Sequence, residues 1–249
     1  MTGFADQFSS HAGDYARFRP RYPLALFRYL ASLVPRHHLA WDAGTGSGQA
    51  ALGLAAHFDR VVATDASAEQ VARAVPHERI EYRVERAEDV SLAPGSVDLV
   101  TVAVAVHWFD FDAFYRAVHR VGAEHGVIAV WTYEDAVIDP AIDPLLQRYD
   151  RNVLAGYWHE RISYIYDRYE SLPFPFAELS RPSFELAAEW DLPQLIGFLH
   201  SWSGARRYME RRGGDPVESI RDELNAAWGD PSRCRTVRWP LHFRIGRIG

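Results

Sequence analysis

The sequence lacks lysine altogether, so all 27 of its basic side chains are arginine. A chain without lysine cannot form a Schiff base with a carbonyl substrate, and it cannot supply the lysine of a Walker-type phosphate-binding loop. Cysteine is almost absent as well. Cys234 is the only one among 249 residues, so no intramolecular disulfide can form. This scarcity suits a reducing compartment, and we expect a cytoplasmic protein.

Several other features are missing. No apolar run approaches the roughly 20 residues that cross a bilayer, and the start "MTGFADQFSS" lacks the basic and apolar regions of a secretory signal. The net charge of −6 argues against binding to nucleic-acid phosphates. The 11 histidines show no metal-binding spacing and no cysteine pair supports them. We therefore expect no membrane, nucleic-acid or metal partner; the sequence carries no indication of an oligomeric state.

What is present is a regular alternation of apolar runs and amphipathic segments up to residue 134. Strands are expected at 39–44, 60–67, 80–87, 97–108 and 126–134, and helices at 23–34, 48–58, 68–75 and 111–121. This rhythm predicts a parallel sheet with helices on both faces. Beyond it we expect helical segments at 142–158, 161–172, 191–203 and 215–229, and strands at 184–190 and 235–248.

The first strand leads into a glycine-rich turn, "DAGTGSG", at residues 42–48. A dinucleotide-binding turn has glycine at the first, third and sixth positions. Here Gly44, Gly46 and Gly48 take the first, third and fifth positions, and Gln49 takes the sixth. A nicotinamide-dependent oxidoreductase is therefore disfavoured, although it remains an alternative, and the missing lysine excludes a P-loop.

The turn is suited to a zwitterion. Bare glycine backbone lets a ligand lie against it, and the N-terminus of the following helix attracts a carboxylate. Asp42, just before the turn, would face a cation. A ligand with both charges is an amino acid, and methionine is the amino-acid part of S-adenosylmethionine.

Residues at the ends of two later strands could bind the ribose and the adenine of such a ligand. Asp65 ends the second strand, 65 − 44 = 21 positions after Gly44, where a carboxylate can accept both ribose hydroxyls. After the third strand, Ala87 would leave room for an adenine ring and Glu88 could accept from its amino group. Asp89 is an equally good acceptor by position.

The segments "DAGTGSG", "ATDAS", "RAEDVSLAPGSVDLV" and "HWFD" together resemble those of class I S-adenosylmethionine-dependent methyltransferases of the type 11 group. More narrowly, "YARFRPRYP", "SWSG" and "RWPLHFRIGR" are similar to segments of yeast-type trans-aconitate methyltransferases. One departure is Val104, where that group often has a polar residue.

The resemblance implies a Rossmann-like α/β fold: a seven-stranded sheet whose last strand is antiparallel, with a helical cap between strands five and six. We expect one methyltransferase domain over 1–249. Its parts are an N-terminal lid at 1–22, a cofactor-binding core at 23–133, the cap at 134–182 and a C-terminal part of the sheet at 183–249.

The candidate residues follow from the turn, the strand ends and the resemblance. The expected cofactor-binding residues are Tyr15, Asp42, Gly44, Gly46, Gly48, Asp65, Ala66, Ala87, Glu88 and Ala103. Tyr15 and Arg19 belong to the lid, where the ring would cover the sulfonium and the guanidinium would hold a substrate carboxylate. Trp108 and Trp202 are further substrate candidates, and His107 is a candidate general base.

These residues predict transfer of a methyl group from S-adenosylmethionine to a small molecule. The resemblance favours a carboxylic acid as the acceptor, which needs no base because it is already ionised. A phenol, amine or alcohol would make a base such as His107 useful. A protein that binds the cofactor without turnover is the alternative from another class.

Overall fold

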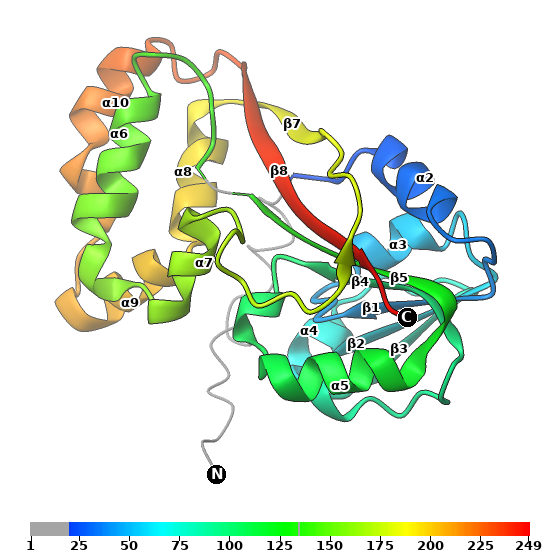
Figure 1. Ribbon diagram of the computed structural model, residues 1–249. Helices are drawn as coiled ribbons and strands as arrows, with labels where there is room; N and C mark the ends of the chain where they lie inside the picture. Colours follow the sequence, from blue (N-terminus) through cyan, green and yellow to red (C-terminus); the bar gives the residue numbers. More distant parts are fainter. Residues whose placement is uncertain (1–19, 134) are drawn as a thin grey trace.

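An eight-stranded sheet forms the centre of the computed structural model, which describes residues 20–133 and 135–249. Its strands are β1 (Leu39–Ala43), β2 (Arg60–Asp65), β3 (Ile80–Val84), β4 (Val97–Ala103), β5 (Gly122–Tyr133), β6 (Ala177–Glu178), β7 (Glu185–Trp190) and β8 (Arg235–Arg247). They lie in the order β3-β2-β1-β4-β5-β8-β6, and β7 also pairs with β8. The first five strands are parallel and β8 is antiparallel to β5, which confirms the expected fold class (Figure 1).

Helices α2 and α3 pack on one face of this sheet and α5 packs on the other. The helices of the described ranges are α2 (Leu24–Ser32), α3 (Gln49–Leu54), α4 (Ala68–Ala72), α5 (Phe111–Val121), α6 (Asp143–Arg148), α7 (Ser163–Tyr166), α8 (Leu192–His200), α9 (Ser203–Arg212) and α10 (Arg221–Trp228). Neighbouring strand residues enter different cores: Val61 and Ala63 pack with α2 and α3, whereas Val62 packs with α5. Burial on both faces explains why these strands are continuous apolar runs.

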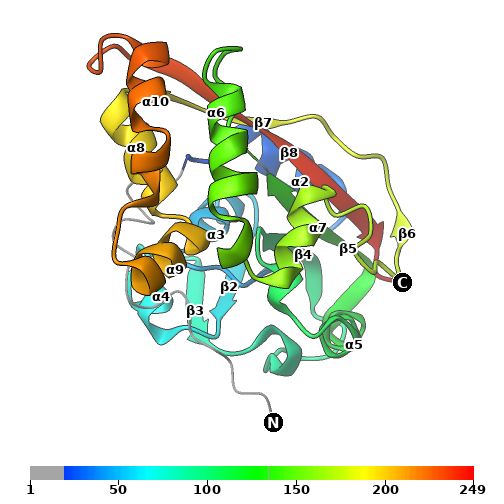
Figure 2. The ribbon, with the colours of Figure 1, turned by 90° about the vertical axis from the view of Figure 1, so that its left-hand side faces the viewer.

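A helical lobe stands beside the sheet (Figures 1 and 2). It contains α6 and α7 from the chain between β5 and β6, as the expected cap does. It also contains α8, α9 and α10 from the chain between β7 and β8. The two stretches contact each other, since the short helix η5 (Ala155–Tyr157) lies against α9. The lobe is therefore built from two parts of the chain.

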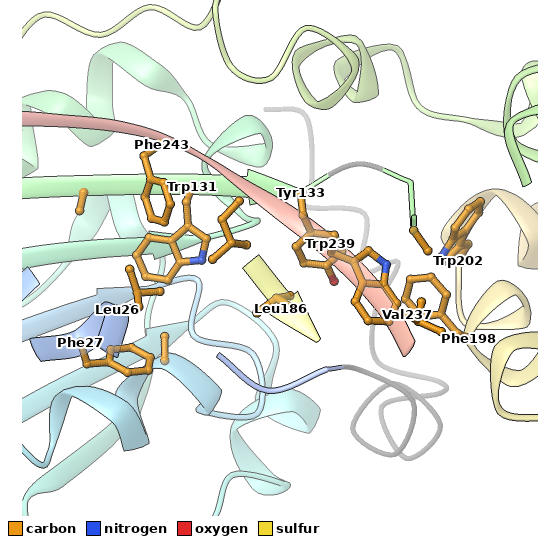
Figure 3. Packing of buried hydrophobic residues seen from close by; sticks show 14 of the residues in the cluster. Leu26, Phe27, Trp131, Tyr133, Leu186, Phe198, Trp202, Val237, Trp239 and Phe243 are labelled. Atoms are coloured by element: carbon orange, nitrogen blue, oxygen red, sulfur yellow. The ribbon is translucent and has the colours of Figure 1, made fainter. Parts of the chain in front are cut away.

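Strand β8 joins the sheet to the lobe. Its second half pairs with β5, and its first half pairs with β7 at the base of the lobe. On β8, Phe243 lies 6.0 Å from Trp131 of the sheet, and Trp239 lies 5.4 Å from Phe198 of the lobe (ring centroids; Figure 3). Burying each such side chain contributes about 1.5–3 kcal/mol, so one continuous core holds both parts.

The structure differs from the sequence-based expectation in four places. The expected helix at 142–158 is divided into α6, the π-helical turn η4 (Tyr149–Val153) and η5. The expected helix at 161–172 ends at Tyr166, and turns follow it. Helix α9 was not expected, because "SGARRYMERR" has hardly any apolar stripe. Strand β6 was also not expected, since two residues are too few to alternate. None of the helices in the described ranges is long and apolar enough to cross a membrane.

Candidate functional site

The three glycines of the turn all have left-handed backbone, with φ of 67° at Gly44, 55° at Gly46 and 88° at Gly48. A Cβ on Gly44 would lie 2.7 Å from Ala105 Cβ, and one on Gly48 would lie 2.4 Å from the Tyr82 hydroxyl. Among the described residues, a Cβ on Gly46 would meet a single atom within 4 Å, at 3.9 Å. Gly44 and Gly48 thus allow close packing inside the protein, whereas Gly46 leaves the surface of the turn open.

Asp65 fastens this turn to the end of β2. Its Oδ2 accepts a hydrogen bond from the Gly46 amide at 2.8 Å, and its Oδ1 accepts one from the Ser67 amide at 2.8 Å. A carboxylate offers about four acceptor positions. The Asp65 carboxylate is therefore fixed at the edge of the open turn, where the predicted ribose contact would be made.

Asp42 lies beneath the turn and is fully buried. Its two oxygens accept hydrogen bonds from the hydroxyls of Thr45 at 2.5 Å and Thr101 at 2.8 Å. Burial raises the pKa of Asp42 to about 6, although both hydroxyls act in the opposite direction. The contacts present are structural, since they hold the turn on β1 and β4; a contact of Asp42 with a cationic ligand group stays a prediction.

The expected adenine side is a short helix, η2 (Ala87–Asp89), in which Ala87 is buried. Glu88 Oε1 accepts from the Asp110 amide at 3.0 Å, and its Oε2 pairs with Arg86 Nε at 3.3 Å. Asp89 is exposed. Glu88 therefore fastens η2 to the start of α5.

The other two expected cofactor residues, Ala66 and Ala103, are half-buried at the carboxyl ends of β2 and β4. The structure thus brings the described cofactor candidates to one edge of the sheet.

A pocket opens between this edge and the helical lobe. Its free space, mouth included, is about 840 Å³. Its lining residues are Val104, His107, Trp108, Tyr133, Asp135, Asp150, Trp158, Ile162, Ile165, Tyr166, Phe198, Ser201, Trp202, Ser203 and Arg206. The structure therefore assembles three substrate or catalytic candidates, His107, Trp108 and Trp202, in one place.

His107 is a buried, neutral side chain in this lining. Its Nδ1 lies 2.8 Å from the hydroxyl of Tyr169, and desolvation lowers its pKa to about 3, helped by the positive charge of Arg161. Arg161 also donates to the main-chain oxygens of His107 and Phe109 at 3.1 and 2.6 Å. The short segment before α5 is thereby tied to the lobe, and the imidazole is a weak base.

Three strained residues lie close to the pocket. Val104 has a φ of 54°, which is a genuine outlier for a β-branched residue, and its amide donates to the Trp131 carbonyl at 2.9 Å. Arg168 and Tyr169 follow each other with φ of 61° and 64°. Each such residue costs on the order of 1–3 kcal/mol, and such strain gathers at functional sites.

Several lining residues were not predicted from the sequence. On the π-helical turn η4, Asp150 is buried with a raised pKa because of desolvation, and its Oδ1 accepts from the Tyr166 hydroxyl at 3.0 Å. Arg206 lies in the first turn of α9, and the rings of Trp158 and Trp202 are 5.8 Å apart. The π-helical turn, a feature frequent at functional sites, has no signal in the sequence.

Tyr15 and Arg19 lie outside the described residues. Within 20–133 and 135–249, no group of three or more histidine, cysteine, aspartate or glutamate side chains could hold a metal ion.

Comparison with known proteins gives consistent matches. A family model described as a methyltransferase domain matches residues 41–130. A Dictyostelium discoideum protein named as a methyltransferase is 32% identical over 254 aligned positions, covering 99% of this chain and 96% of the relative. A Saccharomyces cerevisiae protein named as an S-adenosylmethionine-dependent methyltransferase is 29% identical over 133 positions, covering 49% of this chain and 45% of the relative. A solved structure of a type II methyltransferase from Anaeromyxobacter dehalogenans is 43% identical, with a TM-score of 0.86 and coverage of 92% of this chain and 98% of its own.

Proposed function

Because the chain belongs to the class I S-adenosylmethionine-dependent methyltransferases, we propose that it methylates a small molecule held in the pocket. The observation that carries this proposal is the closeness of the two parts of the site. A Cβ on Gly44 would touch Ala105, and the neighbouring Val104 lines the pocket. A donor on the turn and an acceptor in the pocket would therefore be neighbours at one edge of the sheet.

The turn fits this cofactor. Gly46 leaves its surface open, so the methionine part can lie against bare backbone, and Asp65 would bind the ribose. Ala66, Ala87 and Ala103 would line the space with small side chains. When bound, the cofactor supplies an activated methyl group on a sulfonium. The task of the protein is therefore alignment and the exclusion of water, which together can lower a barrier by roughly 7 kcal/mol or more.

Glu88, in this proposal, keeps η2 in place and faces the adenine. Tyr15 would cover the sulfonium from the N-terminal lid. With Asp42, Gly44 and Gly48 these residues complete the cofactor-binding set, and Glu88 takes precedence over Asp89 because Glu88 is held by the Asp110 amide.

The walls of the pocket support a proposal about the acceptor. Trp108, Trp158 and Trp202 supply flat apolar surfaces, which favour a planar or conjugated molecule and keep water out. We propose a carboxylic acid, with Arg206 of the lining and Arg19 of the lid as its cationic partners. The low basicity of His107 supports an acceptor that is already ionised, because a base with a pKa of about 3 removes protons poorly.

The test is incubation of the full chain with methyl-labelled S-adenosylmethionine and a panel of aromatic and unsaturated carboxylates, phenols and amines, followed by mass spectrometry. We expect labelled methyl esters from the carboxylates. Labelled ethers or methylamines alone would refute the carboxylate part of the proposal. Calorimetric binding of the cofactor with no product from any class would instead favour a protein that binds the nucleoside without turnover.

A further inference from the structure

Val104 lines the pocket with a backbone conformation that does not suit valine. Its φ is 54°, in the left-handed region, where the Cβ of an L-residue crowds the main chain and a β-branched side chain is a genuine outlier. Glycine takes this conformation freely, and asparagine takes it at a lower conformational cost than valine. Either residue would make the same bend after β4, so the course of the chain alone does not explain a valine.

The left-handed backbone changes the side of the sheet on which this valine packs. Side chains along a strand alternate between the two faces. Val100 and Val102 pack in the core on the α5 face, whereas Leu99 and Ala103 pack in the core on the other face. Continued strand geometry would send Val104 to the same face as Val102. Val104 instead packs with Ala103, so two consecutive side chains belong to the core that also contains the aromatic residues of the lobe.

This conformation is fixed at the junction of the two halves of the site. The Val104 amide donates to the Trp131 carbonyl at 2.9 Å, which holds the residue against β5 although it lies beyond the end of β4. The next residue, Ala105, is close to the glycine turn, since a Cβ on Gly44 would lie 2.7 Å from its Cβ. Val104 is only half-buried. A strained apolar residue therefore lines the pocket where a donor on the turn would meet the acceptor.

We propose that Val104 is a specificity-determining residue, whose left-handed backbone places an isopropyl group where the carbon framework of the acceptor packs. A polar substituent on this part of the framework would lose its water without gaining a hydrogen-bond partner from Val104, and is therefore disfavoured. The cationic partner of the carboxylate remains Arg206, and the apolar surface of Val104 helps to keep water from the attacking oxygen. The preferred acceptor is thus an acid without polar substituents next to its carboxylate. This consequence rests on the proposed function.

Val104→Thr isolates the polarity of this surface, because threonine keeps the shape and the backbone strain of valine and adds a hydroxyl. The probe is anilinonaphthalene sulfonate, an aromatic anion that fluoresces in apolar sites, titrated into the full chain saturated with S-adenosylhomocysteine. The signal from the pocket is identified by its loss in Trp202→Ala. We expect Val104→Thr to raise the Kd of this signal about fivefold, and Val75→Thr, at an exposed valine, to leave it unchanged. Equal Kd values for Val104→Thr and wild type would overturn the proposal.

Val104→Asn separates specificity from folding. Asparagine adopts left-handed backbone more readily than valine, so the substitution relieves strain while it removes the apolar surface. We expect the Tm to be unchanged or raised by up to about 4 °C, and the Kd of the probe to rise as in Val104→Thr. A lowered Tm would show that the fold itself requires valine at this position, and would overturn the proposal.

The preference among acceptors gives the kinetic readout. For a carboxylate that is methylated in the panel, the kcat/KM is compared with that of its analogue hydroxylated next to the carboxylate. We expect Val104→Asn to raise the ratio of analogue to parent acid at least about tenfold, while the Kd for S-adenosylhomocysteine changes less than about twofold. An unchanged ratio would refute the role in specificity. If no class of acceptor gives a product, the proposed function fails, while the probe titration and the Tm still decide whether Val104 is an apolar surface held under strain.

Discussion

The two halves of the site use different chemical groups. The proposed cofactor half is made from main-chain groups of one turn and from carboxylates at the ends of adjacent strands. The acceptor half is made from side chains that come from the segment before α5, the π-helical turn, α7 and the junction of α8 with α9. The first half therefore suits one invariant ligand. The second can change its ligand by side-chain substitution, with no change of the turn.

Asp65→Ala should give the largest effect on cofactor affinity and leave the acceptor half intact. The carboxylate ties Gly46 to Ser67 and is the proposed ribose partner. Hydrogen bonds to a charged group contribute about 1.5–3 kcal/mol each, so the Kd for S-adenosylhomocysteine should rise at least about 100-fold. The measurement is calorimetry. Asp59→Ala, an exposed aspartate at the other end of β2, is the control; equal effects of the two would contradict the assignment.

Asp42→Asn should change the free energy of unfolding by an amount that depends on pH. The pKa of Asp42 is raised from 3.8 to about 6, so its charge destabilises the folded state above pH 6 and not below pH 4. A pKa shift of about two units means that the charge of Asp42 destabilises the folded state by about 3 kcal/mol. Asparagine removes this cost but loses a hydrogen bond to Thr45 or Thr101, which offsets about 1 kcal/mol of the gain. The variant should thus be less stable than wild type at pH 4 and about 2 kcal/mol more stable at pH 7.

Denaturant unfolding across this pH range checks the prediction. A stability difference that stays constant from pH 4 to pH 7 would mean that Asp42 titrates normally and that its burial has no electrostatic cost.

Gly46→Ala separates the open turn from ordinary backbone strain. Alanine in left-handed backbone costs about 1–2 kcal/mol wherever it occurs. Gly95 is a matched control, since its φ is 66° and no atom of residues 20–133 and 135–249 lies within 4 Å of an added Cβ. Both alanine variants should lose similar stability by thermal unfolding. Only Gly46→Ala should raise the Kd for S-adenosylhomocysteine, by about tenfold, because its methyl group would lie on the surface proposed to bind the cofactor. Equal Kd values for the two variants would contradict the assignment of that surface.

Arg206→Gln should give the smallest change and act on the acceptor half alone. Arg206 lines the pocket and is half-buried. Because solvent screens its charge, we expect it to contribute about 1 kcal/mol to the binding of a carboxylate. The KM for a carboxylate acceptor should rise about fivefold, with the Kd of S-adenosylhomocysteine unchanged. Arg211→Gln, on the same helix but exposed, should alter neither value. A changed Kd for S-adenosylhomocysteine in Arg206→Gln would contradict the proposal that the two halves bind their ligands independently.

Sequence reasoning worked where local pattern determines structure. The strands and the glycine turn follow from apolar periodicity and from backbone that only glycine adopts readily, and Asp65 lies at a strand end that the pattern locates. It worked less well for roles within the turn: Gly44 and Gly48 are explained by Ala105 and Tyr82, which are distant in sequence.

The pocket shows where such reasoning ends. Asp150 and Tyr166 lie on short irregular helices, and nothing in their local sequence indicates that they meet Trp202 across the lobe. The depressed pKa of His107 depends on burial by Tyr169 and on Arg161, both more than 50 residues away. Long-range packing produces these properties, so they are visible only in three dimensions.

Strand β8 has a mechanical consequence. Its 13 residues run unbroken from the edge of β5 to the foot of the helices, with ladders of hydrogen bonds along both halves. A strand hydrogen-bonded along both halves should resist bending, so we expect the lobe and the sheet to move little relative to each other. Small molecules should then exchange through movement of short connecting loops and individual rings, and crosslinking those loops should lower turnover.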